Sequence, residues 1–159
     1  MNPRKFNKES FDMADSLAKD TAVRLFSYHP QFRAAYTEDY YRDDLEAMYK
    51  IDLVIIDRQT SEHTYGLEVE VKSDWKSNSD FPFHDVHFLP RKFEKWTDPK
   101  YTYGKPVHWI MFNQDGSRHL IVFDDDIRAL HKKKVVNCRQ RGPEELFVVD
   151  HKAVYFDYL

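Results

Sequence analysis

KIDLVII (residues 50–56) and LEVEVK (residues 67–72) are the two most strand-like stretches of this sequence. The first is a β-branched apolar run, which is typical of a buried strand. The second alternates strictly, so its three apolar residues should face the core while the charged Glu68, Glu70 and Lys72 share the opposite face. A polar stretch separates the two, and the sequence therefore predicts a β-hairpin.

Patterns on both sides of this hairpin predict further helices and strands. Apolar residues recur every three or four positions over residues 8–28, which indicates a helix. Pro30 ends it, because the residue before a proline avoids helical angles. Residues 31–49 are expected to be a short helix or a covering loop, and residues 73–90 to be irregular. The other expected elements are helices over 91–96 and 126–133 and strands over 107–112, 119–123, 146–149 and 153–156.

The order of these elements predicts an α/β fold in which a mixed central β-sheet is flanked by helices. At 159 residues the chain has room for one domain, and its 42% of apolar residues are enough to build a core. We therefore expect residues 1–159 to form a single domain.

Composition excludes several classes of protein. No apolar run approaches the roughly 18 residues that span a membrane, and the N-terminus lacks the apolar segment of a secretory signal. The lone Cys138 cannot build a disulfide framework, so we expect a reducing, cytoplasmic location. Only four glycines are present, which excludes a glycine-rich phosphate loop, and a net charge of −3 excludes a basic coat over the whole surface.

A strand aspartate beside an acid-X-lysine triplet points to phosphodiester chemistry. Cleavage needs a hard cation held by carboxylates, and an ammonium that orients the attacking water. Asp52 with Glu70-Val71-Lys72 provides both, since the period of two puts Glu70 and Lys72 on one face, about 7 Å apart. Acid-X-lysine occurs four times in the chain, but only Glu70 follows a strand that contains an acid. An unpaired carboxylate inside the aliphatic run around Asp52 would be costly to bury.

Residues 50–72 resemble the core motif of the PD-(D/E)XK nuclease superfamily. The resemblance implies a restriction-endonuclease-like core of helix, β-hairpin, helix and strands. It also implies a nuclease that depends on Mg²⁺, with Mn²⁺ as a substitute. Carried over to this chain, Asp52 and Glu70 would be metal ligands, the Val71 carbonyl a third ligand and Lys72 the catalytic lysine. Ile51 stands where the family name has proline.

Three more acids are candidates for this site. The family often adds an acid from its first helix. Helical periodicity favours Asp15, at the edge of the apolar face, whereas the resemblance leaves Asp20 open. Glu68 shares the face of Glu70 and could reach a second metal ion. Each of the three could instead be an ordinary surface acid.

Cationic residues that could hold phosphates follow the hairpin. The segment from residue 127 to 141 holds six Lys or Arg and no acid, and the helix after Pro90 adds three more. Either set could instead be a solvated face. Before that helix, His84 and His87 have the spacing of metal ligands, although we favour His87 as a proton carrier near the site. The candidate nucleic-acid-binding residues are Arg91, Lys92, Lys95, Lys132, Lys133, Lys134, Arg139 and Arg141.

The expected function is Mg²⁺-dependent hydrolysis of nucleic acid, with DNA favoured and no membrane involved. A nuclease of this size that cuts both strands would work as a homodimer. One alternative is a protein that keeps this fold and binds nucleic acid without cutting it. Another is a phage or bacterial accessory protein whose aromatic surface binds protein, because 16% of the residues are aromatic. The sequence does not separate DNA from RNA, or duplex from single strand.

Overall fold

The structure is a computed structural model that describes residues 8–41, 51–96, 98–138 and 142–158. Residues 42–49 of the expected covering segment lie outside these ranges, as do Arg139 and Arg141. In the described part of the chain, no helix is both long and apolar enough to cross a membrane.

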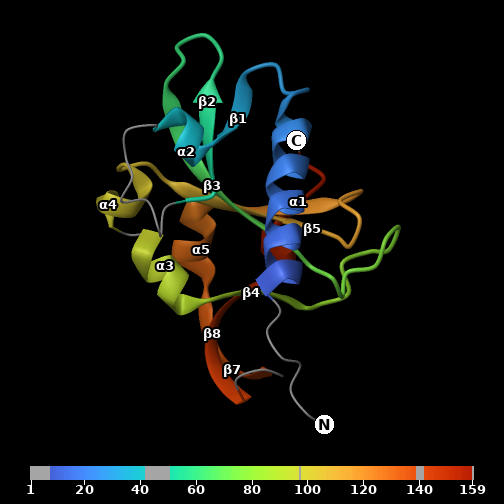
Figure 1. The fold of residues 1–159 in the computed structure, drawn as a ribbon. Coiled ribbons are helices and arrows are strands. Elements are labelled where there is room, and N and C mark those ends of the chain that lie inside the picture. Colours follow the sequence, from blue (N-terminus) through green and yellow to red (C-terminus); the bar gives the residue numbers. More distant parts are fainter. Residues whose placement is uncertain (1–7, 42–50, 97, 139–141, 159) are drawn as a thin grey trace.

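A six-stranded mixed sheet forms the centre of the described fold (Figure 1). β3 and β5 pair in parallel, and all other neighbouring strands pair antiparallel. A parallel pair needs a crossover, which here carries the short helices α3 (Pro90–Trp96) and α4 (Pro99–Thr102). The strand order is β1 (Phe32–Tyr36), β2 (Leu53–Asp57), β3 (His63–Val71), β5 (Val107–Phe112), β6 (His119–Val122) and β9 (Tyr155–Phe156). The mixed α/β class predicted from the sequence is confirmed.

The predicted hairpin is confirmed as β2 and β3, which pair antiparallel with Leu53 opposite Leu67. Gly66 of β3 allows a close approach at this point. A Cβ atom there would come within 2.5 Å of the Ile51 Cδ1 atom and within 3.3 Å of Val107 Cγ2. The missing side chain therefore lets Ile51, which precedes β2, pack directly against β3.

Helix α1 (Lys8–Phe26) covers one face of the central sheet, as its apolar spacing predicts. Ala18, Ala22 and Phe26 are buried there against residues that include Leu67 and Val69 of β3. The alternation of β3 is thus confirmed for its apolar residues, which point toward this helix.

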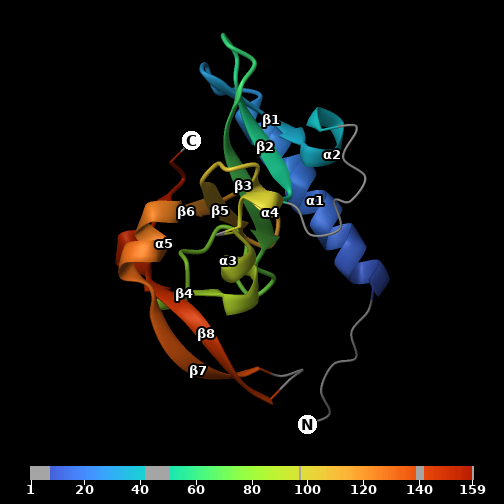
Figure 2. The same ribbon diagram turned by 90° about the vertical axis from the view of Figure 1, so that its left-hand side faces the viewer.

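The opposite face of the sheet is covered by a second layer (Figure 2). This layer contains α3, α5 (Asp124–Leu130) and an antiparallel sheet ordered β4 (Asp85–Phe88), β8 (Gly142–Asp150) and β7 (Lys132–Cys138). Trp109 and Met111 of β5 share one apolar cluster with Phe88 and Phe147 of this layer. Both views show the β7–β8 ribbon extending beyond the rest of the fold.

Three strands lie where the sequence predicts none. β1 occupies part of the segment expected to be a helix or loop, and β4 lies in the segment expected to be irregular. The helix predicted over 126–133 ends at Leu130, and the lysines at the end of that prediction begin β7 instead. β8 is also longer than the expected 146–149. β1 and β4 pair with strands that are distant in the sequence, while β7 pairs with the adjacent β8, and β-propensity is a weak guide to any of these pairings.

Candidate metal and catalytic site

Asp52 and Glu68 form the centre of the candidate site. Because Leu53 pairs with Leu67, the antiparallel register brings Asp52 level with Glu68 on the neighbouring strand. The sequence pattern predicts Glu70 as the partner of Asp52. Alternation gives the face of a residue but not the register between two strands, and in this register Glu68 is the acid of β3 that lies level with Asp52.

Glu68 is only 5% exposed, although the sequence suggests a solvated face for it. The second layer covers that face, and strand alternation cannot reveal such a cover. Glu68 Oε1 accepts a hydrogen bond from Lys92 Nζ of α3 at 3.0 Å. Its other oxygen, Oε2, is buried and has no hydrogen-bond donor in the described structure. A buried acceptor without a donor is costly, so this oxygen is placed to take a proton or a cation.

Burial raises the pKa of both acids. At Glu68 the charge of the neighbouring Asp52 carboxylate raises the pKa further, and Lys92 only partly offsets this. At Asp52 the Val69 N–H, which donates to Oδ2 at 3.0 Å, and the Lys19 ammonium lower the pKa without cancelling the effect of burial. Two carboxyls level with each other on neighbouring strands are costly to ionise together, so a cation at this point would stabilise both charges.

Two lysines from different elements partly balance this acid pair. Lys92 contacts Glu68, while Lys19 Nζ of α1 lies 3.7 Å from Asp52 Oδ1 and 3.0 Å from Asp15 Oδ2. Burial opposes the charge on both lysines, but the nearby carboxylates outweigh it and raise their pKa values. Sequence reasoning gave Lys92 a phosphate-binding role only and missed Lys19. The i,i+4 spacing of Asp15 and Lys19 was the signal that could have found it.

Glu70 and Lys72 lie further along β3, toward the rim. Lys72 Nζ is 3.2 Å from Glu70 Oε1, and the Glu70 side chain is 43% exposed. The Lys72 N–H donates to the Phe112 carbonyl, which continues the pairing with β5. Val71 packs its side chain toward α1, so the triplet spans both faces of the sheet as alternation requires.

Of the two first-helix acids, Asp15 lies by the site and Asp20 does not. Asp15 reaches it through Lys19, and its charge contributes to the raised pKa of Asp52. Asp20 instead accepts a hydrogen bond from the Tyr36 hydroxyl of β1. This placement agrees with the periodicity argument.

His87 of β4 borders the Glu70–Lys72 end of the site. Burial, followed by the Lys72 ammonium, lowers the pKa of His87, so its imidazole is neutral at neutral pH. The same face of the second sheet carries Lys134, whose Nζ lies 3.4 Å from Asp85 Oδ2. An imidazole able to accept a proton therefore sits between Lys72 and a cationic strand.

The expected phosphate-binding residues fall into two groups. Lys92 and Lys95 are half-buried on α3, and the side chain of Arg91 lies outside the described structure. On β7 three consecutive lysines, Lys132, Lys133 and Lys134, are all exposed.

Two of the other acid-X-lysine triplets have a structural explanation. Asp98 accepts a hydrogen bond from the Lys100 N–H at 2.9 Å and caps α4. Asp150 accepts from the Lys152 N–H at 2.8 Å and caps the single turn η1 (His151–Ala153). Short acids commonly bond the backbone two residues on, so the lysine spacing in these triplets is incidental.

Comparisons of the chain with models of protein families, with curated proteins and with solved structures found no match. Its function is therefore argued from geometry. The Asp52–Glu68 pair offers oxygen ligands to a hard divalent cation. Lys92 contacts Glu68 of that pair, while Lys72 and the neutral imidazole of His87 lie further along β3 beside Glu70.

Proposed function

We propose that this chain is a Mg²⁺-dependent nuclease of PD-(D/E)XK type, with nucleic acid, in the first instance DNA, as its substrate. The observation that carries the proposal is the Asp52–Glu68 pair. The two acids lie side by side on neighbouring strands, and a buried Glu68 oxygen lacks a donor in the described structure. A carboxylate pair of this kind suits Mg²⁺, with Mn²⁺ as a substitute.

A purely structural role explains the pair poorly. Ile51, Leu53 and Val54 surround Asp52, and aliphatic residues there would pack without the cost of burying two acids. Strongly perturbed acids kept against that cost are typical of functional sites.

The order of the elements also supports the proposal. Helix α1, the β2–β3 hairpin, the crossover helix α3 and strand β5 follow the helix, β-hairpin, helix and strands that the resemblance implies. In this arrangement α1 and α3 each bring one lysine to the acid pair.

In the proposed mechanism Asp52 and Glu68 would hold the ion, and Glu68 would take the ligand role that the motif suggests for Glu70. The bound ion would supply charge stabilisation at the phosphoryl group and an activated water. The Lys92 ammonium, which lies 3.0 Å from Glu68 Oε1, would contact the scissile phosphate beside the acid pair. Lys72 adds a second positive charge at the rim, and the neutral imidazole of His87 accepts a proton.

The substrate backbone would leave the site along the second sheet. His87 and Lys132 flank Val148 of β8 in register, so these side chains share a face with Lys134. Lys72 of the rim influences the pKa of His87, which ties this face to the site. Exposed lysines on such a track provide phosphate contacts without reading sequence.

The test is cleavage of plasmid DNA, and of matched single-stranded DNA and RNA, in Mg²⁺ and in chelator. We expect cleavage with Mg²⁺ only, and its loss in Asp52→Asn and Glu68→Gln. Glu70→Gln is the matched control from the same strand face and should keep part of the activity. Magnesium should also raise the melting temperature of the wild type, because binding at a hundredfold excess over Kd adds about 2.7 kcal/mol to the free energy of unfolding. The melting temperature of Asp52→Asn should not change.

Failure would take one of two forms. If no metal shifts the melt, the metal site is wrong. If Glu70→Gln loses cleavage and Glu68→Gln keeps it, the sequence motif identifies the metal ligand better than the strand register does.

The second candidate function is a nucleic-acid-binding protein that does not cut. It is favoured by Lys19 and Lys92, which already balance much of the charge on the acid pair. This protein would be retained on DNA in a salt-sensitive manner with no cleavage in Mg²⁺ or Mn²⁺, and its melt would ignore both ions.

A further inference from the structure

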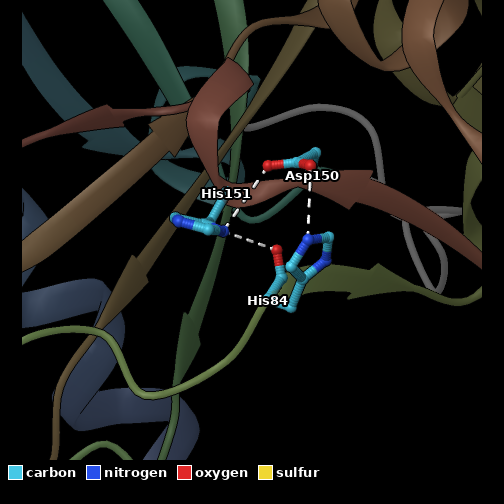
Figure 3. Close-up of side chains that lie close together, drawn as sticks. All are labelled: His84, Asp150 and His151. Carbon is cyan, nitrogen blue, oxygen red and sulfur yellow. Dashed lines mark hydrogen bonds and ion pairs between the residues drawn. The ribbon is translucent and has the colours of Figure 1, made fainter.

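A second cluster of ligand-type side chains lies where β4 begins and β8 ends (Figure 3). Asp85 pairs with Asp150 in the register of these strands, so His84 just before β4 meets His151 just after β8. One ligand atom each from His84, Asp150 and His151 lie within 4.8 Å of one another. In the described ranges this is the one group of three such residues that could share an ion.

The distances in this cluster match those between the ligands of a small metal ion. His84 Nε2 lies 3.6 Å from Asp150 Oδ2, and His151 Nδ1 lies 3.5 Å from Asp150 Oδ1. Tetrahedral zinc with bonds of about 2.0–2.1 Å holds its ligand atoms about 3.4 Å apart. Both pairs need only small movements to reach a shared ion.

Neighbouring groups already orient two of the three ligands. The Asp85 carboxylate lies 2.9 Å from His84 Nδ1, which holds the proton on that nitrogen and leaves the Nε2 lone pair facing Asp150. A carboxylate behind a histidine in this way is the usual outer partner of a metal ligand. The Lys152 N–H fixes Asp150 from the other side at 2.8 Å.

His151 needs one rearrangement. Its Nδ1 now bonds the His84 carbonyl at 2.7 Å. To bind an ion through Nδ1, the ring must carry its proton on Nε2 and release that carbonyl. His84 is exposed and the other two residues are half-buried, so an ion could enter from solvent.

We propose that His84, Asp150 and His151 bind one transition-metal ion of the zinc class. Imidazole nitrogen with carboxylate oxygen selects such ions, whereas the all-oxygen Asp52–Glu68 pair selects Mg²⁺. The ion would join the start of β4 to the end of β8, and so fasten the strand that carries His87 to the neighbour of the lysine-bearing β7. The site is independent of the proposed nuclease activity, because the two share no residue.

The experiment is calorimetric titration of the full chain with Zn²⁺, and with Co²⁺ to read the ligands from its visible spectrum. We expect one ion per chain in the wild type, with a Co²⁺ spectrum that includes nitrogen ligands. The double variant His84→Gln/His151→Gln should lose this binding. His87→Gln should keep it, which also separates this cluster from the His84–His87 spacing seen in the sequence. Asp85→Asn should weaken affinity about 10–100-fold, as loss of an outer partner does.

Three results would overturn the proposal. The first is a wild type that binds no more Zn²⁺ than the double variant. The second is binding lost in His87→Gln. The third is binding lost in Asp52→Asn with the histidines intact, which would place the ion in the other site. Circular dichroism of each variant checks that the fold is kept.

Discussion

Glu68 links the stability of this fold to pH. Burial raises its pKa and that of Asp52, so the folded chain holds a proton that the unfolded chain releases above the ordinary carboxyl pKa of about 4. Where the folded state binds more protons, the free energy of unfolding falls as pH rises. The contribution of these two acids to the free energy of unfolding is therefore fully present below the ordinary carboxyl pKa, and it is lost as pH rises through their raised pKa values.

We expect Glu68→Gln to flatten that loss, because the amide stays neutral at every pH. Urea unfolding of the wild type and variant, in chelator between about pH 5 and pH 8, measures the difference in slope. Burial lowers the pKa of His63 to about 4, which acts in the opposite sense but cancels in the comparison. Glu62→Gln, in the exposed loop, is the control. Equal slopes for wild type and Glu68→Gln would show that the acid pair is ionised throughout.

The two first-helix acids provide another residue-scale prediction. Asp15→Ala should reduce cleavage more than Asp20→Ala, because Asp15 holds Lys19 against Asp52. Asp20→Ala removes only the bond from Tyr36. Initial rates at saturating Mg²⁺ make the comparison. The reverse ranking would mean that Asp20 enters the site only when metal or substrate is bound.

At the scale of elements, β7 divides its three lysines between two faces. Lys133 pairs with Phe147, which faces the core, while Lys132 and Lys134 share the face of His87. If that face carries the substrate backbone, Lys132→Ala and Lys134→Ala should each lower the log–log salt slope of DNA binding by roughly 0.7–0.9.

Lys133→Ala is the matched control and should leave the slope unchanged. Binding measured over a range of salt concentrations, with the metal replaced by Ca²⁺, gives all three slopes. Equal losses at the three lysines would mean that β7 attracts nucleic acid only by its overall charge.

The contact between Ile51 and β3 gives a second prediction for elements. Gly66→Val would place two methyl groups where Ile51 and Val107 already lie, and overpacking a filled core costs about 1–3 kcal/mol. The displaced Ile51 would also shift Asp52, so cleavage should fall with stability. Urea unfolding measures the loss. Ala22→Val, a volume increase in the core between α1 and the other face of the sheet, is the comparison, and an equal change in Asp52-dependent activity would contradict the assigned role of Gly66.

For the whole molecule, the sequence predicts those parts that local patterns determine. The β2–β3 hairpin, α1 and the β5–β6 pair follow from periodicity, and they bring Asp52 and the charged residues of β3 to one place. Register, cover and distant pairing are not local properties. The partner of Asp52, the burial of Glu68 and the strands β1 and β4 therefore needed the structure.

The crossover between the parallel strands has a consequence for the time at which the site is assembled. Asp52 and Glu68 belong to a local hairpin, which forms in microseconds once its residues are free to meet. Lys92 lies in the crossover and reaches Glu68 only when the longer segment between β3 and β5 closes. Closing this segment is slower than forming the hairpin and costs more conformational entropy. During synthesis Lys19 of α1 is therefore the one of the two lysines that precedes the acid pair, and Lys92 joins the pair only after the crossover has left the ribosome.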